Sequence, residues 1–405
     1  MKTASAENLT KKEGAIKIMI LASFYRGDHV SRMNPYHQLS KVASSWNSIL
    51  FKELKKLDLE LHIVQFYPVF RPSIFREGNV NYYYLPRVPK IDSFTSIIKK
   101  IRIRKLAKEI KPDVIHGIGS EHGNVYPALQ DGIPSIITIH GYMKKIIKLK
   151  GNKDILKSLF MVREEDKAIK SSTRIIAING YMKEQFIGSG CSEDKISIVP
   201  NALNSNFLVG CLDEERDIDI LMVGTIYALK NQHRALEIIK ELKSEFGKTP
   251  KMVIAGNPTG ESKEYYDSII KYKNRNKLSN VNLIGAVEQD KLKELYCKSK
   301  ILLHISDFEA DPTVIAEALA CGVLPIVNPV AGLAYRVKDN ENGYYIDIHN
   351  IHNAALALNN ILDDFNKAQE LVTKGKQDVL AERSPEKIAV NTAGLYYRVI
   401  DEYDG

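Results

Sequence analysis

Residues 304–327 read His304-Ile-Ser-Asp-Phe-Glu309-Ala-Asp-Pro-Thr-Val-Ile-Ala-Glu317-Ala-Leu-Ala-Cys-Gly322-Val-Leu-Pro325-Ile-Val. A β-branched, apolar run leads into this stretch and another closes it, as expected of two buried parallel strands. Between them, Asp311 suits a helix N-cap and Pro312 suits the first helical position. The stretch therefore predicts a strand, a loop, a helix over residues 312–320 and a second strand.

The same alternation of short apolar runs and longer helical patterns extends through the chain, which favours βαβ units and parallel sheets. It restarts at Asp217-Ile-Asp-Ile-Leu-Met-Val, so we expect an α/β protein of two Rossmann-like, doubly wound domains. The predicted strands are 16–23, 61–66, 81–85, 113–118, 135–140, 174–178, 196–199, 217–223, 251–255, 281–284, 301–305, 324–327 and 343–346. The predicted helices include 45–57, 96–110, 232–246, 262–271, 290–297, 312–320 and 354–374.

Proline and asparagine place the expected hinge near Val199-Pro200-Asn201, so the first domain is predicted over residues 1–200 and the second over 201–384. Ser384-Pro385-Glu386 predicts the start of a last helix that runs to about Tyr403. Ligands of doubly wound sheets bind outside the carboxyl ends of the strands. A cleft between two such domains is therefore the expected ligand site.

Composition excludes several classes of protein. Of the 405 residues, 44% are hydrophobic and 26% charged, which is ordinary for a globular chain. No run approaches the roughly 18 apolar residues of a membrane-spanning helix, and the first residues lack the apolar run of a signal peptide. The four cysteines have no C-x-x-C spacing, which is typical of a reducing compartment and gives no zinc framework. We expect a cytoplasmic globular protein.

The net charge of +8 is unevenly distributed. Residues 1–200 hold 33 Lys and Arg against 19 Asp and Glu, whereas residues 201–405 hold 24 against 30. A basic half joined to a mildly acidic half argues against a nucleic-acid binder and suggests that the basic half meets something anionic. Its excess gathers in residues 99–111 and 144–157, which are either solvated helix faces or a surface that rests on anionic lipid.

The opening stretch also carries groups that could bind a nucleotide. The first N–H groups of its predicted helix, on Thr313, Val314 and Ile315, meet the positive end of the helix dipole, which suits a phosphate. Glu309 and Glu317 stand eight residues apart, and a carboxylate can accept two hydrogen bonds from a ribose diol or from sugar hydroxyls. The alternative is that Asp311-Pro312 merely starts a helix and that Glu317 is an ordinary helix charge.

These residues resemble the retaining nucleotide-sugar glycosyltransferases of family 4, which have the GT-B fold. The family pattern Glu-x7-Glu, Ala-x-Ala-x-Gly and a proline-bearing strand reads here Glu309, Glu317, Ala318-Leu-Ala320-Cys-Gly322 and Pro325. Further matches follow in the family's order at Asp113-Val-Ile-His116, Thr138-Ile-His140-Gly141, Lys195-Ile-Ser-Ile-Val-Pro200-Asn201, Val223-Gly224-Thr225, Lys230-Asn231 and Ile254-Ala-Gly256-Asn-Pro. The GT-B fold implies that two domains face each other across a cleft and that a C-terminal helix, about 385–405, returns to the first domain.

The resemblance implies a role for each matched residue. Glu317 would hold the donor ribose, Glu309 a hydroxyl of the transferred sugar, and Lys230 the diphosphate, assisted by the amides of residues 313–315. His140 would line the reaction centre beside the incoming hydroxyl, and the backbone at Gly285 would face the base. The implied reaction retains the anomeric configuration, needs no metal or other cofactor, and takes a sugar from a UDP or GDP donor. A saccharide or lipid-linked saccharide of the cell envelope is the implied acceptor, reached from the cytoplasmic face of the membrane.

This chain departs from the family pattern at the diphosphate. Thr225 stands where the family has arginine, and Arg26 in the first loop is a possible replacement. Asp311-Pro312 replaces a small, glycine-rich loop, which removes an N–H donor and adds a negative charge. Two other functions therefore stay open: a non-catalytic nucleotide-sugar-binding protein, and a GT-B-fold sugar epimerase or phosphorylase. His116, His122 and His304 lack metal-ligand spacing, and we interpret them as structural residues.

Overall fold

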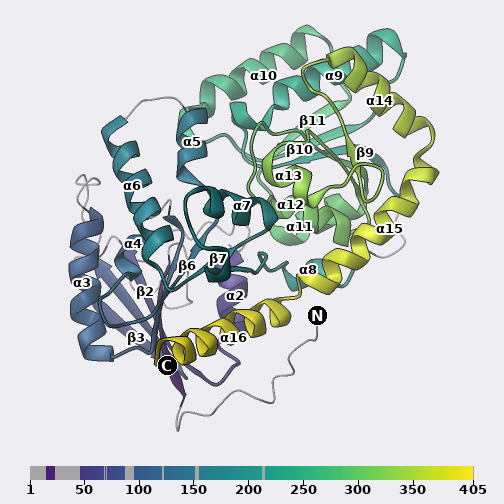
Figure 1. The fold of residues 1–405 in the computed structure, drawn as a ribbon. Helices are drawn as coiled ribbons and strands as arrows, with labels where there is room; N and C mark the ends of the chain where they lie inside the picture. Colours follow the sequence, from purple (N-terminus) through teal and green to yellow (C-terminus); the bar gives the residue numbers. More distant parts are fainter. Residues whose placement is uncertain are drawn as a thin grey trace. The chain divides into compact units, whose positions relative to one another are not determined.

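The computed structural model describes residues 15–22, 46–67, 69, 71–86, 95–120, 123–150, 155–211 and 215–404. The chain divides into two compact units, drawn in Figure 1. One contains the described residues up to Pro200 together with the chain from Pro385 onward, and the other is Asn201–Ser384. Each unit has its own sheet and its own core, so each is an α/β layered structure in its own right.

The first unit is built on an eight-stranded sheet, counted over the described residues, in the order β3-β4-β2-β1-β5-β6-β7-β8. All its pairings are parallel except that of β3 with β4. The strands are β1 (Ile16–Leu21), β2 (Leu59–Tyr67), β3 (Ser73–Glu77), β4 (Val80–Pro86), β5 (Val114–Ile118), β6 (Ser135–Ile139), β7 (Arg174–Ala177) and β8 (Ile196–Ile198). The central strands β1, β5 and β6 are almost wholly buried, as their continuous apolar sequences predict.

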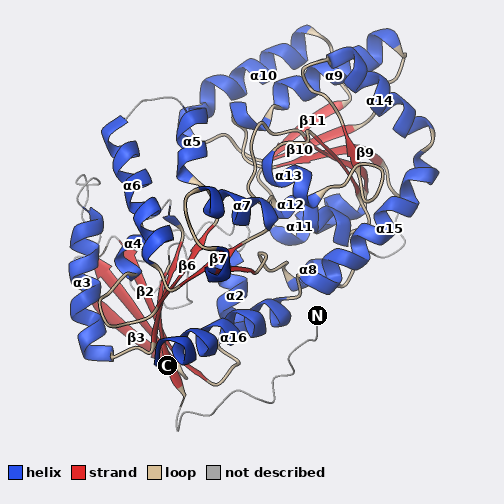
Figure 2. Cartoon of the chain, viewed as in Figure 1, coloured by secondary structure: helices blue, strands red, loops and turns tan. Residues whose placement is uncertain are grey.

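Helices cover both faces of this sheet (Figure 2). They are α2 (Trp46–Leu54), α3 (Thr95–Ile110), α4 (Val125–Ala128), α5 (Met143–Lys150), α6 (Ile155–Ser171) and α7 (Gly180–Gly188). The last helix of the chain, α16 (Pro385–Asp404), also belongs to this unit and packs against α2, β5 and β6. The Tyr396 hydroxyl is 2.8 Å from Nδ1 of His116, whose Nε2 is 2.8 Å from the Thr138 hydroxyl. Complete burial lowers the pKa of His116 to about 3, so the imidazole is neutral and joins α16 to the sheet.

The second unit is built on a sheet of six parallel strands among its described residues, in the order β11-β10-β9-β12-β13-β14. The strands are β9 (Ile218–Val223), β10 (Met252–Ala255), β11 (Val281–Gly285), β12 (Ser299–His304), β13 (Leu324–Val327) and β14 (Tyr344–Tyr345). Side chains alternate across it: Ile220 and Met222 enter one apolar cluster and Leu221 enters the other. Both faces of the sheet are therefore buried.

Two layers of helices supply the other halves of these clusters. One cluster holds residues of α9 (Gln232–Glu245), α10 (Lys263–Arg275), α14 (Ile351–Asp363) and the first part of α15 (Phe365–Glu382). The other holds residues of α8 (Ser205–Leu208), α11 (Gln289–Cys297), α12 (Thr313–Ala320), α13 (Ala331–Arg336) and the last part of α15. This is the doubly wound arrangement that the alternating sequence pattern predicts.

Most predicted strands and helices are confirmed to within a few residues, with two exceptions. The antiparallel strand β3 is missing from the prediction, because its pattern is short and three of its five residues are exposed. The predicted helix over residues 354–374 is wrong as a single helix, because the chain breaks at Asp364 into α14 and α15. The last helix is confirmed, since α16 spans Pro385–Asp404.

The expectation of reduced cysteines is also wrong. Cys211 and Cys297 form a disulfide across a sequence separation of 86 residues, whereas Cys191 and Cys321 are free and buried. Sequence spacing gave no sign of this pair, because the fold brings the two residues together.

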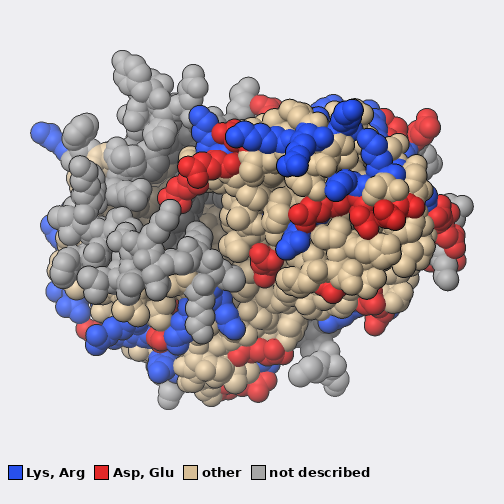
Figure 3. All heavy atoms as spheres, turned by 90° about the horizontal axis from the view of Figure 1, so that it is seen from above, with Lys and Arg blue, Asp and Glu red and all other residues tan. Residues whose placement is uncertain are grey.

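Charge on the described surface is mixed rather than of one sign. The face drawn in Figure 3 carries groups of Lys and Arg beside groups of Asp and Glu. On α3 the exposed apolar side chains Ile97 (44% exposed) and Ile101 (64% exposed) line a shallow pocket together with Lys100, Arg104 and Tyr126. None of the helices in the described part of the chain is both long and apolar enough to span a bilayer.

Candidate active site

The candidate site begins where two neighbouring strands of the second unit end. Strands β9 and β12 are paired in the sheet, so the loops that follow them emerge side by side. Lys230 closes a short 3-10 turn after β9, and Glu309 lies in the loop between β12 and α12. Residues almost eighty positions apart in the sequence thus meet at one edge of the sheet, as expected of a ligand site outside the carboxyl ends of parallel strands.

Asn231 holds these two loops together. Its backbone is left-handed, with φ of 56°, which turns the chain sharply into α9. Its amide group donates to the Ile305 carbonyl at 3.0 Å and to Oδ1 of Asp307 at 2.6 Å. The Asp307 amide in turn donates to the Leu229 carbonyl at 2.9 Å. The position of Lys230, between Leu229 and Asn231, is therefore fixed by both loops.

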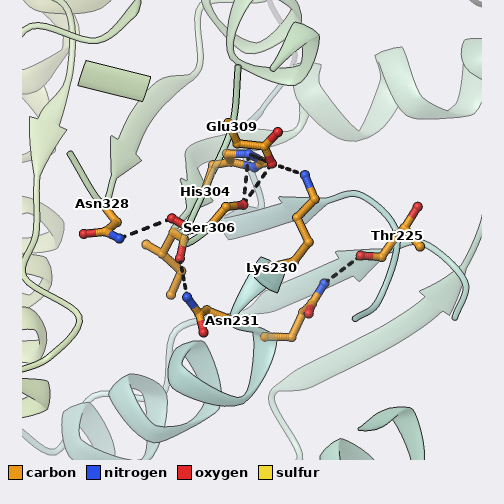
Figure 4. A network of polar contacts seen from close by, with 9 residues as sticks. Thr225, Lys230, Asn231, His304, Ser306, Glu309 and Asn328 are labelled. Atoms are coloured by element: carbon orange, nitrogen blue, oxygen red, sulfur yellow. Dashed lines mark hydrogen bonds and ion pairs between the residues drawn. The ribbon is translucent and has the colours of Figure 1, made fainter. Parts of the chain in front are cut away.

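The Glu309 carboxylate is the centre of a buried polar network (Figure 4). Its Oε1 accepts from the Lys230 ammonium, from the Ser306 hydroxyl at 3.0 Å and from Nε2 of His304 at 3.2 Å. Both side chains of the Lys230–Glu309 ion pair are only 16% exposed. Within the described part of the chain every hydrogen bond to this carboxylate goes to Oε1, and Oε2 points away from the three donors. Oε2 can therefore accept from a ligand.

Electrostatics keep Glu309 ionised and His304 neutral. Burial alone would raise the pKa of Glu309, but the hydrogen bond from His304 and the charge of Lys230 outweigh it and lower the pKa to about 2. Burial lowers the pKa of His304, against the opposing effect of Glu309. A neutral imidazole that donates from Nε2 fits this hydrogen bond. At neutral pH the network therefore holds one ammonium and one carboxylate.

Two glycines allow the loops of the site to approach each other. A Cβ on Gly256, at the end of β10, would lie 1.9 Å from the carbonyl oxygen of Gly224, at the end of β9. A Cβ on Gly332, in α13, would lie 1.8 Å from the Ala310 carbonyl oxygen, and the Gly332 amide donates to the Glu309 carbonyl at 2.8 Å. No side chain fits at either position, so these contacts set the backbone course on both sides of Lys230 and Glu309.

The start of α12 differs from the prediction. Pro312, rather than Asp311, is the N-cap residue, and no side chain caps the helix. The Asp311 carboxylate instead accepts from the Arg383 guanidinium at 2.8 and 2.9 Å, with both side chains buried. The Arg336 guanidinium lies 3.7 Å from the same carboxylate. Because Asp311 is neutralised by a residue 72 positions away, its charge does not face the first turn of α12.

The amides of that first turn are only partly available. The Ile315 amide donates to the Pro312 carbonyl at 3.2 Å, so the prediction that it is free for a phosphate is wrong. The amides of Thr313 and Val314 stand as the candidates, and both residues are partly exposed. A phosphate near them would meet the positive end of the helix dipole.

Glu317 lies one turn further along α12, in a different environment from Glu309. Its Oε2 accepts from the buried Tyr296 hydroxyl at 3.0 Å. Burial raises the pKa of Glu317 to about 7, although the hydrogen bond from Tyr296 acts in the opposite direction. Near neutral pH this carboxyl is therefore divided between its protonated and ionised forms.

The remaining predicted site residues are dispersed. Gly285 ends β11 with φ of 76°, and its carbonyl accepts from the Gly256 amide at 2.8 Å. Thr225 is exposed after β9, and its carbonyl accepts from the Gln232 side chain at 3.2 Å. His140 follows β6 in the first unit, where its ring centroid is 3.4 Å from a ring centroid of Trp46. Arg26 lies outside the described residues.

Sequence reasoning missed two members of the network, His304 and Ser306. The interpretation of His304 as a structural residue rather than a metal ligand is compatible with this contact, because its imidazole donates to Glu309 and orients that carboxylate. The available signal was position: His304 is the last residue of β12, at the carboxyl end of a parallel strand, and Ser306 follows it by two residues.

Comparison with known proteins gives matches to both units. Residues 49–207 match the family described as Glycosyltransferase Family 4, and residues 212–378 match the family described as Glycosyl transferases group 1. The chain is 26% identical over 246 residues to an uncharacterized glycosyltransferase of Methanocaldococcus jannaschii, covering 56% of this chain and 60% of that relative. It therefore spans about three fifths of the length of this relative.

Two further proteins are similar over more of the chain. One is the UDP-Gal:alpha-D-GlcNAc-diphosphoundecaprenol alpha-1,3-galactosyltransferase of Escherichia coli, 24% identical over 310 residues, covering 72% of this chain and 77% of the relative. The other is the crystal structure of Anabaena HepE in complex with UDP, with a TM-score of 0.70 at 13% identity, covering 94% of this chain and 99% of that one. The second likeness is one of fold.

Proposed function

The chain belongs to glycosyltransferase family 4 and has the GT-B fold, and we propose that it is a retaining enzyme. In this proposal it transfers a sugar from a nucleoside-diphosphate sugar to a hydroxyl of a saccharide or lipid-linked saccharide. The observation that carries the proposal is the Lys230–Glu309 network, which sits at adjacent strand ends beside the first turn of α12. It places a cation, a carboxylate with an available oxygen and helix amides in one small region.

Donor binding would exchange partners within this network. The diphosphate draws the Lys230 ammonium away from Glu309 and takes hydrogen bonds from the amides of Thr313 and Val314. Oε2 of Glu309 accepts from a hydroxyl of the sugar, while Ser306 and His304 keep the carboxylate in place through Oε1. Glu317 accepts from the ribose diol. Lys230 thus exchanges the Glu309 carboxylate for the diphosphate, and Glu309 keeps the hydrogen bonds from Ser306 and His304 when it loses the ammonium.

The proposed chemistry uses this cation for the leaving group. As the glycosidic bond breaks, the diphosphate gains negative charge, which a fixed ammonium and backbone N–H groups stabilise more in the transition state than in the bound donor. The acceptor hydroxyl attacks on the face that the diphosphate leaves and passes its proton to a phosphate oxygen, which retains the anomeric configuration. This route needs no protein base and no metal ion. His140 would line the acceptor side.

A UDP-sugar is the donor that we propose, with a lipid-linked saccharide as the acceptor. The Escherichia coli relative is named for a UDP-galactose donor and a diphosphoundecaprenol-linked acceptor, and the Anabaena neighbour is described with UDP. Such an acceptor lies in a membrane, so a peripheral position at the cytoplasmic face follows for this chain. On α3, the exposed Ile97 and Ile101 lie among Lys100 and Arg104, a combination that suits an anionic bilayer surface.

The alternative of a non-catalytic binding protein has lost one of its two supports. It rested on Thr225, where the family has arginine, and on the charge of Asp311. Arg383 pairs with Asp311 in the interior, so this charge does not oppose a phosphate at α12. Thr225 leaves one cation fewer than the family has at this position, and Lys230 is the cation of the described site on which diphosphate stabilisation depends.

Transfer assays with variants of Lys230 test the proposal. Wild-type protein is given a panel of UDP- and GDP-sugars with polyprenol-diphosphate-linked N-acetylhexosamine, and product anomers are assigned by NMR. We expect transfer from a UDP-sugar with an α-linked product, and a loss of kcat of about 10²–10³-fold in Lys230→Ala. Lys240→Ala, an exposed lysine on α9, is the matched control and should retain full activity. Nucleotide-sugar binding without transfer to any acceptor would favour the non-catalytic function, and a β-linked product would refute retention.

A further inference from the structure

Three cysteines meet beneath the far end of α12. Among the described residues, one group of three potential metal ligands has its ligand atoms within 4.8 Å of one another, and it consists of Cys211, Cys297 and Cys321. They come from three different segments: Cys211 follows α8, Cys297 is the last residue of α11, and Cys321 is the C-cap residue of α12. Cys297 and Cys321 are buried, with 6% and 1% exposure, and Cys211 is partly exposed. The disulfide joins the sulfurs of Cys211 and Cys297, and it does not explain why the sulfur of Cys321 lies beside them.

The surroundings of this group are cationic. The Arg216 guanidinium donates to the Cys321 carbonyl at 2.9 Å and also reaches the Tyr296 and Ser299 carbonyls. Lys293, Arg216 and Lys376 place positive charge near Cys321, and Glu317 places a carboxyl there. Three positive side chains against one carboxyl suit an anionic metal–thiolate group at this position. A Zn²⁺ ion with three thiolates carries a net charge of −1.

We propose that, in the reduced protein, Cys211, Cys297 and Cys321 together bind a Zn²⁺ ion through their three thiolates. Zn²⁺ takes thiolates at about 2.3 Å in tetrahedral geometry, which puts the sulfurs roughly 3.8 Å apart. The Cys321 sulfur lies within 4.8 Å of the two bonded sulfurs, so reduction of the disulfide and separation of Cys211 from Cys297 would bring all three to this spacing. The fourth position is left for a water molecule. The ligands are 86 and 24 residues apart along the chain, which is why the sequence shows no zinc-finger spacing.

The disulfide and the metal site are alternative states of the same sulfurs. A dithiol reductant supplies two electrons and two protons to Cys211 and Cys297 and is itself oxidised to a disulfide. Zn²⁺ then displaces one proton from each of the three thiols, so three protons are released for each ion bound. In the reverse direction a small-molecule disulfide accepts the two electrons and is reduced to two thiols by taking up two protons, the Cys211–Cys297 disulfide re-forms, Cys321 takes up a proton and the ion is released.

The metal would act on the helix that carries Glu317, at the end opposite its proposed phosphate contacts. The Cys321 amide donates to the Glu317 carbonyl at 3.1 Å, and Cys297 directly follows Tyr296, which donates to the Glu317 carboxylate. Zinc would tie the C-terminus of α12, the end of α11 and the segment after α8 into one rigid corner. This structural role goes beyond the proposed transfer reaction and does not depend on it.

Metal analysis of the full chain tests the inference. Protein is purified with a phosphine reductant, loaded with Zn²⁺ and analysed by native mass spectrometry, and Co²⁺ is used to detect the thiolate-to-metal charge-transfer band. We expect one Zn²⁺ per chain, the Co²⁺ band, and at least a tenfold weaker affinity in Cys321→Ser. Cys191→Ser, the buried free cysteine of the first unit, is the matched control and should bind as wild type does.

Three results would overturn the inference. They are a folded, reduced wild type that retains no Zn²⁺, a Cys321→Ser variant that binds as tightly as wild type, and a disulfide that persists under the reductant. Circular dichroism establishes that each variant is folded. If Cys321→Ser does not fold, Cys211→Ser replaces it, because Cys211 is partly exposed and its substitution disturbs the core least. Donor binding by UDP, measured on the same samples, separates this test from the proposed function.

Discussion

The pKa of about 7 at Glu317 predicts that the affinity for the donor depends on pH between about 6 and 8. If the ribose diol requires the ionised carboxylate, only the ionised fraction of the free protein is competent. This fraction is about 9% at pH 6 and about 91% at pH 8, so the apparent Kd of a nucleoside-diphosphate sugar should fall about tenfold between them. We attribute this pH dependence of donor affinity to a single carboxyl, that of the partly buried Glu317 in α12.

Titration of the groups around Glu317 would not produce the same pH dependence of donor affinity. Burial raises the pKa of Tyr296 well above 10 and that of Cys321 to about 12, and Glu309 has a pKa of about 2. None of these groups titrates between pH 6 and pH 8. The diphosphate of a nucleotide sugar is substituted at both ends and has no ionisation in this range either, so it is a better probe than a free nucleoside diphosphate.

Isothermal titration of a UDP-sugar at pH 6, 7 and 8 measures the effect, with Glu317→Gln as the variant. Wild type should show the tenfold gain, and Glu317→Gln should bind weakly with an affinity that changes little over this range. Glu245→Gln, an exposed glutamate at the end of α9, should behave as wild type. A wild-type Kd that stays constant from pH 6 to 8, or an equal gain in Glu317→Gln, would refute the role of this carboxyl.

Protein stability gives a second readout of the same pKa. A carboxyl whose pKa is raised on folding binds its proton more tightly in the folded state, so the free energy of unfolding falls as pH rises from about 4.5 to above 7. At 1.36 kcal/mol for each unit between 4.5 and about 7, the fall amounts to about 3 kcal/mol at most. Compared with wild type, Glu317→Gln should therefore gain stability at pH 8 relative to pH 5 in urea unfolding. Equal pH profiles for the two proteins would place the pKa of Glu317 near its ordinary value.

Three further predictions concern contacts of the second unit. Arg383→Met removes the guanidinium that hydrogen-bonds the buried Asp311 carboxylate and leaves it with the longer contact to Arg336 at 3.7 Å. The free energy of unfolding should fall by up to about 3–5 kcal/mol in urea titrations, whereas Arg383→Met with Asp311→Asn should lose clearly less. Equal losses would show that the ion pair is not the cause. Gly256→Ala places a Cβ 1.9 Å from the Gly224 carbonyl oxygen, so the variant should lose about 1–3 kcal/mol of folding free energy and melt at a lower temperature. In Gly260→Ala, the matched control, the new Cβ meets nothing within 4 Å and the melting temperature should not change. Similar melting temperatures for the two variants would contradict this reasoning. His304→Ala removes a hydrogen bond that helps to hold the pKa of Glu309 near 2, so the acid limb of the pH profile of kcat/KM should move to higher pH. An unchanged acid limb would argue that Lys230 alone keeps Glu309 ionised.

Local patterns predicted most of the strands and helices and brought Lys230 and Glu309 together, although they missed β3 and the break at Asp364. Apolar runs such as Ile301–His304 and Leu324–Val327 predicted strands because a parallel sheet buries both faces, and Lys230 met Glu309 because each follows one of two adjacent strands. What failed depended on contacts between distant residues. The N-cap propensity of Asp311 was overridden by Arg383, 72 positions away, and the Cys211–Cys297 pair spans 86 positions. A local sequence pattern carries no information on whether residues so far apart in the sequence come into contact in the fold.

Glu309 and Glu317 show why the identity of a side chain does not determine its role. Both carboxyls are desolvated, yet Glu309 has three donors on one oxygen, one of them an ammonium, whereas Glu317 has a single neutral phenol. Desolvation therefore prevails at Glu317 and raises its pKa to about 7, and it is overcome at Glu309, where the pKa falls to about 2. In the proposed donor complex, a sugar hydroxyl would meet a carboxylate that is ionised at neutral pH, whereas the ribose diol would meet one that must first lose a proton. Binding of the nucleotide would then be coupled to proton release, while recognition of the sugar would not.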